Sequence, residues 1–154
     1  MEKQKNLVPI YEKFFPMKWM QLTKTLKKMT NHKFYCQVFT HPLQNQWEFI
    51  YYSKEGIKII LVFYSDGIQS YVDIKEFCIP KIYVQKNYDE KILTTLIQNI
   101  LPLDFHMILF YIKNSHHLEL CTKNRFKKKD PFTMVLSIKA TFIETKSQNS
   151  HKKR

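Results

Sequence analysis

Three consecutive segments in the first half of the chain have the apolar pattern of β-strands, and the connections between them are short. Residues 33–40 and 46–53 alternate between two faces, and residues 57–64 are apolar almost throughout. Connections this short join neighbouring strands as antiparallel hairpins. A tight-turn signal follows, after which residues 68–74 can extend the same sheet. The sequence therefore predicts an antiparallel sheet.

Helices are predicted before and after these strands. A helix from Pro16 presents one apolar face, because large side chains recur every three or four positions. These side chains are Phe15, Trp19, Leu22, Leu26 and Met29. A second apolar stripe begins after Asn87 and is stopped by Pro102, with Asp89 and Glu90 in its first turn. Negative charge there favours the helix dipole, so this segment also predicts a helix.

The last third of the chain is less clearly patterned. Residues 105–112 and 117–122 predict two strands, and a basic run follows at residues 123–129. Residues 131–146 alternate like a strand but also keep helical spacing, and Asp130-Pro131 is a good helix start. We favour a helix for this segment and keep a strand as the alternative.

The size of the chain predicts a single folded domain. With 154 residues, of which 44% are hydrophobic, it is long enough to bury a core. We expect an N-terminal arm over residues 1–15, one domain over residues 16–146 and a basic flexible tail over residues 147–154. No apolar run approaches the roughly 18 residues needed to span a bilayer, so we expect a soluble cytosolic or nuclear protein without a membrane partner.

The composition favours a nucleic-acid partner. The net charge is +12 and 15% of the residues are aromatic, which suits a phosphate backbone with stacked bases. The alternative is that most rings belong to the core and most lysines to ordinary solvated faces. The residues best placed for nucleic-acid contact combine the aromatic strand at residues 46–53 with the basic run. They are Trp47, Tyr51, Tyr52, Lys123, Arg125, Lys127, Lys128 and Lys129.

Signatures of catalysis are not recognised in the sequence. The chain has only two glycines, whereas phosphate-cradling loops need several. His116 and His117 are adjacent on a predicted strand, where their side chains would point to opposite faces and could not share a metal ion. The three cysteines are widely spaced and read as reduced core residues. We therefore expect a non-catalytic protein with no cofactor and no metal.

The order of the elements resembles an OB fold. A helix, three antiparallel strands, a helix, two closing strands and a terminal helix describe such a barrel. Residues 22–29, 33–40, 47–53 and 57–64 resemble the start of the small OB subunits of the CST telomere complex and of replication protein A. The expected fold class is mainly β with helices: a single OB barrel with an N-terminal helix, a helix between strands three and four, and a C-terminal helix.

This resemblance implies a partner-dependent function. The protein would be an adaptor in a telomere-associated, telomerase-associated or single-stranded-DNA-binding complex, located in the nucleus at chromosome ends. It would pair with a larger OB-fold subunit through its C-terminal helix and contact single-stranded DNA directly or through that partner. The interface residues would be Met134, Val135, Ile138 and Phe142.

A strand at residues 131–146 would favour a second resemblance. The element order is then similar to the head domains of the end-joining DNA repair scaffolds Cernunnos and PAXX and of the centriolar cartwheel protein. The turn at Asp66 and Gly67, followed by Tyr71, would match their strand-end turn. In that interpretation the basic hairpin is a head-to-head contact loop, and Phe126 is its inserted residue.

Overall fold

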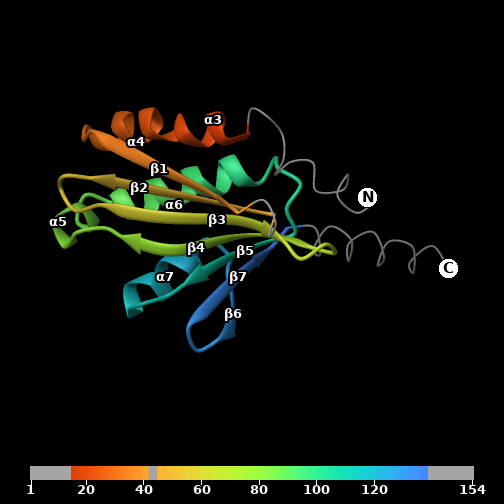
Figure 1. Cartoon of the computed structure of the whole chain (residues 1–154). Coiled ribbons are helices and arrows are strands. Elements are labelled where there is room, and N and C mark those ends of the chain that lie inside the picture. The colour runs from red at the N-terminus through yellow and green to blue at the C-terminus, as the bar shows by residue number, and fades with distance from the viewer. Residues whose placement is uncertain (1–14, 42–44, 139–154) are drawn as a thin grey trace.

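The strands predicted in the first half of the chain form one side of a single open sheet (Figure 1). The computed structural model describes residues 15–41 and 45–138. Four strands follow each other as antiparallel neighbours, as the short connections predict. They are β1 (Phe34–His41), β2 (Gln46–Ser53), β3 (Lys58–Ser65) and β4 (Ser70–Cys78).

The predicted helix at the start of the domain is present as two consecutive helices, α3 (Phe15–Met20) and α4 (Leu22–Thr30). The predicted apolar face is confirmed, because Trp19, Leu22 and Leu26 are buried. Asn31 ends α4 in the left-handed conformation that asparagine tolerates. Apolar spacing thus set this element correctly.

The chain then crosses over the sheet and returns. The short helix α5 (Lys81–Val84) leads into α6 (Tyr88–Ile100), the second predicted helix, and α6 leads into β5 (Met107–Tyr111). The intervening helix returns the chain to the starting end of the sheet, so β5 pairs with β4 in the parallel direction. The remaining elements are α7 (Ser115–Lys123), β6 (Lys127–Asp130) and β7 (Thr133–Ser137).

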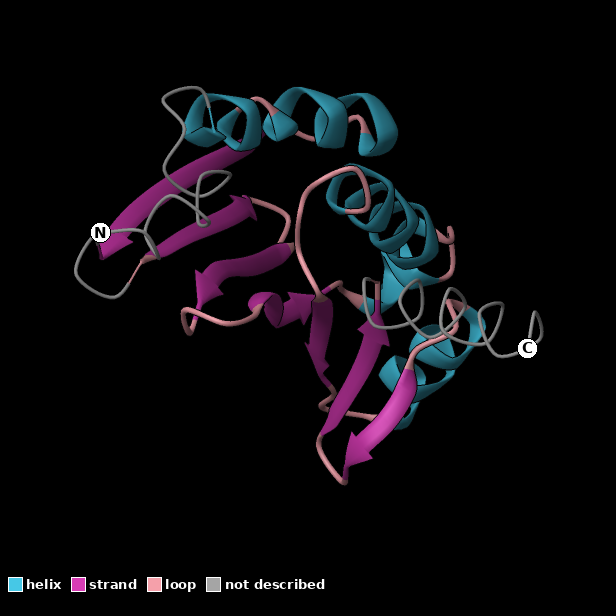
Figure 2. Ribbon diagram, turned by 90° about the vertical axis from the view of Figure 1, so that its right-hand side faces the viewer, coloured by secondary structure: helices cyan, strands magenta, loops and turns pink. Residues whose placement is uncertain are grey.

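The OB-barrel prediction is wrong. The seven strands form one mixed sheet in the order β1-β2-β3-β4-β5-β7-β6. The crossover through α6 places β5 beside β4, and β7 inserts between β5 and β6, so β1 and β6 do not pair. A closed barrel has no free edges, whereas this sheet is open with two. Figure 2 shows it as a twisted arc around the helices.

Two element types in the last third are also corrected. The segment predicted as a strand at residues 117–122 lies in α7, because the Asn114 side chain accepts a hydrogen bond from the backbone N–H of His117 at 2.8 Å and starts a helix there. The favoured helix at residues 131–146 is wrong over Thr133–Ser137, which pairs with β5 as β7. Pairing on both sides stabilises the extended conformation of this segment, whose local pattern permits either a helix or a strand. Residues 139–146 lie outside the described part.

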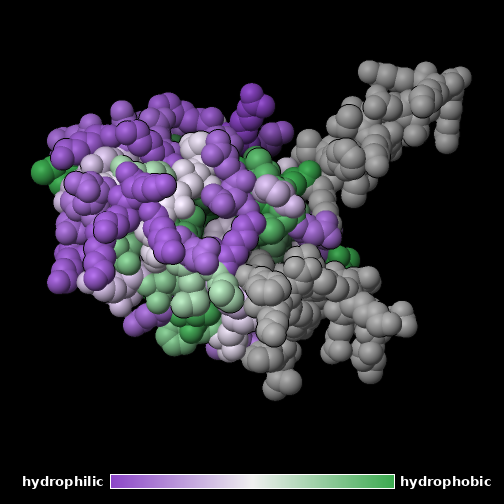
Figure 3. Space-filling view, turned by 90° about the horizontal axis from the view of Figure 1, so that it is seen from above, coloured by the Kyte–Doolittle hydropathy of each residue, from purple (hydrophilic) through white to green (hydrophobic). Residues whose placement is uncertain are grey.

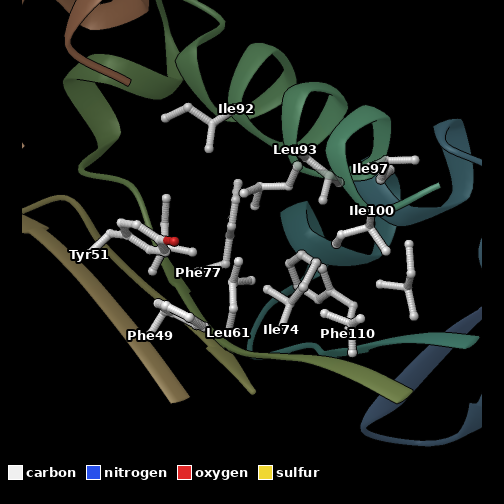
Figure 4. Packing of buried hydrophobic residues seen from close by; sticks show 14 of the residues in the cluster. Phe49, Tyr51, Leu61, Ile74, Phe77, Ile92, Leu93, Ile97, Ile100 and Phe110 are labelled. Carbon is white, nitrogen blue, oxygen red and sulfur yellow. The ribbon is translucent and has the colours of Figure 1, made fainter. Parts of the chain in front are cut away.

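The core lies between the sheet and its helices. α3, α4, α6 and α7 all contribute side chains to one buried cluster on a single face of the sheet. Figure 4 shows side chains of β2 to β5 facing the apolar side of α6. Rings dominate this core: Phe63 contacts Trp19, Phe49 and Phe105 with centroid separations of 4.7, 5.6 and 5.5 Å. This packing holds β4, β5 and α6 in fixed positions around the site described next.

Candidate active site

The strands β4 and β5 separate at their carboxyl ends. Their parallel pairing covers only Tyr71–Ile74 and Met107–Phe110. Just beyond it the pairing of β3 with β4 shifts by one residue, so that Lys75 forms a bulge, and a bulge bends its strand. β5 ends at Tyr111 while β4 continues to Cys78. Ligands of open sheets bind beyond the carboxyl ends of parallel strands, so this gap is the natural place for a site.

Three adjoining cavities lie beyond these strand ends. The largest, about 610 Å³, lies between the first turn of α6 and α7. A second, about 350 Å³, reaches from there to Phe77 and α5, and a third, about 240 Å³, lies between the ends of β4 and β5. Asp89 and His116 line the first two, and His117 lines the second and third. The titratable side chains therefore stand where the cavities meet.

Asp89 and His116 form a hydrogen-bonded pair at this junction. Asp89 lies in the first turn of α6 and is only 2% exposed, whereas His116 lies in the first turn of α7 and its side chain is 45% exposed. The imidazole Nε2 contacts the carboxylate Oδ2. With Nε2–H donating to Asp89, Nδ1 is left as a proton acceptor. A carboxylate that orients an imidazole in this way is the arrangement of a general base.

The neighbouring His117 has a different role. Its Nδ1 accepts a hydrogen bond from the backbone N–H of Lys113 at 3.2 Å, and its other nitrogen hydrogen-bonds the backbone of Phe77. Burial lowers the pKa of His117, so the ring is neutral at physiological pH. Both nitrogens are used, and the ring also packs edge-on against Phe77 and Phe110. His117 therefore ties the end of β4 to the segment after β5.

The electrostatics of the largest cavity oppose those of the whole chain. The chain carries a net charge of +12, yet the described residues that line this cavity include three carboxylates and one lysine. Lys123 donates to Glu90 at 2.8 Å, and the described lining residues keep an excess of carboxylates over lysines. Acidic residues in the first turn of α6 disfavour a phosphate group at that helix end and favour a cation. The cavity is thus suited to a positively charged ligand.

The predicted aromatic residues do not gather on one surface. Tyr51 is fully buried on the helix-covered face, where its hydroxyl donates to the backbone carbonyl of Trp19 at 2.5 Å, so it is not available for stacking on a base. Trp47 lies on the same face and is half-buried. Tyr52 points to the opposite face and stacks on Tyr35. Alternation along β2 separates the three predicted side chains.

The predicted basic and interface residues are likewise distributed over several elements. Lys123 ends α7 at the rim of the largest cavity, and Arg125 follows it with a positive φ of 69°. Three exposed lysines lie in β6: Lys127, Lys128 and Lys129.

The residues predicted for a helical interface alternate on β7 instead. Met134 is 2% exposed and packs in the core, while Val135 occupies the other face and Ile138 is half-buried. Phe142 lies outside the described residues. The predicted pairing with a larger OB subunit thus loses the helical face that was to carry it.

Asp89 and His116 were missed because α7 was read as a strand. A signal for the helix is present, since Asn114 is a favoured N-cap residue and His117, Leu120 and Cys121 follow at helical spacing. Asp89 was interpreted only as a dipole residue. Its pairing with a histidine 27 positions later depends on the crossover, which no local pattern reveals.

Other kinds of site find less support. Within residues 15–41 and 45–138, no group of three or more His, Cys, Asp or Glu side chains is arranged to hold a metal ion. Cys121 is buried, Cys36 is half-buried and Cys78 is exposed, and all three thiols are free. The expectation of core cysteines is therefore wrong for Cys78. No described helix is both long and apolar enough to cross a membrane.

Comparisons with known proteins give one structural likeness. No protein-family model matches the chain, and no curated protein matches it. The solved structures that resemble it include the crystal structure of the "putative acyl-CoA N-acyltransferase" from Klebsiella pneumoniae, with a TM-score of 0.42 and 12% sequence identity. The match covers 85% of this chain and 94% of that chain. A likeness at this level assigns neither a family nor an activity to this chain.

The function expected from the OB resemblance is nevertheless corrected. The adaptor in a telomere or single-stranded-DNA complex required a closed barrel and a terminal helix, and β7 with the open sheet replaces both. The head-domain alternative finds no support either, because its contact residue Phe126 is 4% exposed and packs in the core. The expectation of a non-catalytic protein rested on missing nucleophile motifs, on scattered carboxylates and on adjacent histidines placed on a strand. The contact of Asp89 with His116, which lies on a helix, overturns the last two of these premises.

Proposed function

We propose that the protein is an enzyme that binds a small amine beyond the carboxyl ends of β4 and β5 and removes a proton from its nitrogen. The observation that carries this proposal is the buried Asp89 carboxylate bonded to His116 at the junction of two cavities. The excess of carboxylates around the largest cavity favours a cationic substrate. Its volume of about 610 Å³ suits a small molecule.

The chemistry of the proposed step follows from the tautomer of His116. Nε2–H donates to Asp89, so Nδ1 accepts the proton from the substrate ammonium, and the N–H bond of the substrate breaks as the imidazole N–H bond forms. Asp89 stabilises the resulting imidazolium by its charge. The substrate nitrogen keeps the electron pair and becomes a nucleophile. Proton transfer of this kind contributes typically about 10²–10⁴-fold to a rate.

The test is a binding experiment observed at the histidine rings. Protein labelled with ¹⁵N in histidine is titrated with primary amines, and with a carboxylic acid and an alcohol of the same carbon skeleton. We expect amines to shift the His116 ring signals in preference to the other two classes. Asp89→Asn keeps the shape of the side chain but removes its charge, so it should weaken amine binding and change the His116 tautomer populations.

The matched control is His41→Gln, because His41 is an exposed histidine on the distant strand β1. This variant should bind amines like the wild type. Equal binding of the carboxylic acid and the amine, or amine binding that is unchanged in Asp89→Asn, contradicts the proposal.

A further inference from the structure

The two edge strands of the sheet differ in how open they are to another strand. β6 contains Lys127, Lys128 and Lys129 among its four residues, and its pairing with β7 is irregular. Lysines and bulges are features by which proteins block strand addition at an edge. β1 is twice as long, contains no lysine, arginine or proline, and pairs with β2 in unbroken register. β1 is therefore an unprotected edge of the described sheet.

The second half of β1 is accessible from both faces of the sheet. Gln37, Phe39 and Thr40 are all exposed, and neighbouring residues of a strand point to opposite faces. Phe39 retains 48% of its accessible surface, which is unusual for a phenylalanine of a regular strand. An added strand would pair with the backbone of β1 and cover the Phe39 ring on one face.

The helices beside β1 carry several lysines, whereas Glu48, opposite Phe39 on β2, is an acidic residue next to β1. Residues 15–41 contain five lysines and neither aspartate nor glutamate. Four of these lysines are exposed on α3 and α4, which pack beside β1, and no ion pair joins them to any described residue. They are Lys18, Lys24, Lys27 and Lys28. Viewed from above, this side of the molecule is mainly hydrophilic (Figure 3).

We propose that β1 binds an extended acidic segment of another protein as an added strand. Hydrogen bonds between the two backbones would supply affinity, because an edge strand offers a row of unpaired N–H and C=O groups. The new strand would lie about 4.8 Å beyond β1, within reach of lysine side chains on the helices. Charge complementarity favours an acidic strand over a second copy of this chain, whose lysines would repel those already present. This site is independent of the function proposed above.

The first experiment measures amide hydrogen exchange in the full chain with and without a synthetic peptide of about ten residues that alternates valine with glutamate. In the free protein we expect every second amide of β1 to exchange rapidly, because edge amides that point outward have no partner. The peptide should protect those amides and leave the amides of β6 unchanged. Protection of all β1 amides in the free chain would overturn the proposal, because the edge would already be covered.

Two further peptides separate strand addition from simple charge attraction. A version with glutamine in place of glutamate should bind about tenfold more weakly, and a glutamate version interrupted by proline should not protect β1. Equal binding of the proline version would show that the lysines attract any acidic chain, which contradicts pairing at β1. A protein that forms dimers in sedimentation, with β1 protected in the dimer, would identify a second copy as the occupant and overturn the acidic partner.

Matched variants of the protein complete the test. The triple change Lys24→Gln, Lys27→Gln and Lys28→Gln should weaken peptide binding about tenfold. The control removes the same charge at the other edge, by Lys127→Gln, Lys128→Gln and Lys129→Gln, and should leave the affinity within about twofold of the wild type. An equal loss in both triple variants would assign the effect to net charge alone and contradict a site at β1.

Discussion

The part of the sheet before the β4–β5 step and the part beyond it are built by different means. β1 to β4 follow one another through short connections, and each pairs with its predecessor in sequence. Beyond β4, a helix precedes β5 and another helix precedes β6, and β7 lies between these two strands in the sheet. The parallel pairing of β4 with β5 spans only Tyr71–Ile74 of β4. Stacked and edge-on rings pack in the interior of the first part, whereas the three adjoining cavities and the Asp89–His116 pair lie at the end of the second.

The comparison teaches where chemistry is placed in this fold. Where β4 and β5 separate, backbone groups at the strand ends lose their ladder partners and must find others. His117 supplies hydrogen bonds to both sides of the gap, to the N–H of Lys113 and to the backbone of Phe77. The same gap leaves room for a ligand beside His116. The pairing of β1 with β2 has no comparable interruption.

The largest expected effect comes from emptying the core of the antiparallel part. Phe49 is fully buried between Trp47, Tyr51 and Phe63, so Phe49→Ala should lower the free energy of unfolding by about 3–5 kcal/mol. Urea denaturation followed by circular dichroism measures it. The control is Phe132→Ala, because Phe132 is 72% exposed, and its midpoint should stay close to that of the wild type.

The same variant also tests whether the two parts are separable. Under conditions in which Phe49→Ala remains folded, the His116 ring should respond to amines as in the wild type. A lost response in the folded variant would show that the site depends on the antiparallel core, and the comparison drawn above would fail.

A smaller effect is expected from the buried Tyr51 hydroxyl, which joins β2 to α3 in that core. Tyr51→Phe removes the donor to the Trp19 carbonyl and should cost about 1–2 kcal/mol of unfolding free energy. Tyr52→Phe is the matched control, because Tyr52 is the next residue of β2 but lies half-buried on the other face. Urea midpoints of the two variants that fall equally would argue against a specific role of the Tyr51 hydrogen bond.

How far the sequence predicts this fold depends on the range of the interactions that decide it. The first helix, the strands β1 to β3 and helix α6 were predicted correctly, because their apolar periodicity and their short connections are local features. The strand β7 was not, since Thr133–Ser137 satisfies both patterns and only its position between β5 and β6 selects the extended form. The crossover through α6 decides that the sheet stays open instead of closing into a barrel. It too depends on contacts between residues far apart in the sequence.

The candidate site follows the same division. The side chains of Asp89 and His116 are visible in the sequence, and the helix around His116 has a recognisable N-cap in Asn114. Their contact joins the starts of α6 and α7, which β5 separates in the sequence. Local periodicity therefore cannot predict it. The lysines are also divided between two regions of the fold. Lys127, Lys128 and Lys129 lie on an edge strand, whereas four exposed lysines lie on α3 and α4.

The pH dependence of stability should separate the second part from the first. Burial lowers the pKa of His117 in the folded protein below its ordinary value of 6.5. The unfolded chain therefore binds a proton that the folded chain resists, so folding stability falls as the pH drops below about 6.5 and levels off below the folded-state pKa. Thermal unfolding at several pH values should show this fall.

His117→Gln is the variant that assigns the pH dependence. It should be less stable than the wild type at neutral pH, because the ring contacts with Phe77 and Phe110 are lost, and its stability should change less between neutral and mildly acidic pH. His32→Gln is the control, since His32 lies near Glu55 in the antiparallel part. A fall in stability that persists in His117→Gln would exclude His117 as its origin.

The smallest expected effect concerns the ion pair at the rim of the largest cavity. Lys123 and Glu90 keep much of their side-chain surface exposed, at 68% and 39%, and solvent screens such pairs strongly. Lys123→Gln should therefore leave the urea midpoint unchanged within error. It should still raise amine affinity about twofold to threefold, because it removes the only lysine among the described residues that line this cavity and frees the Glu90 carboxylate. Lys91→Gln, on the same helix as Glu90, removes an equal charge outside this cavity lining. The amine affinity of this control variant should therefore stay at the wild-type value.

A fall in amine affinity in Lys123→Gln would mean that the lysine itself contacts the ligand. The ligand would then carry an anionic group, which would reverse the charge preference assigned to the second part of the sheet.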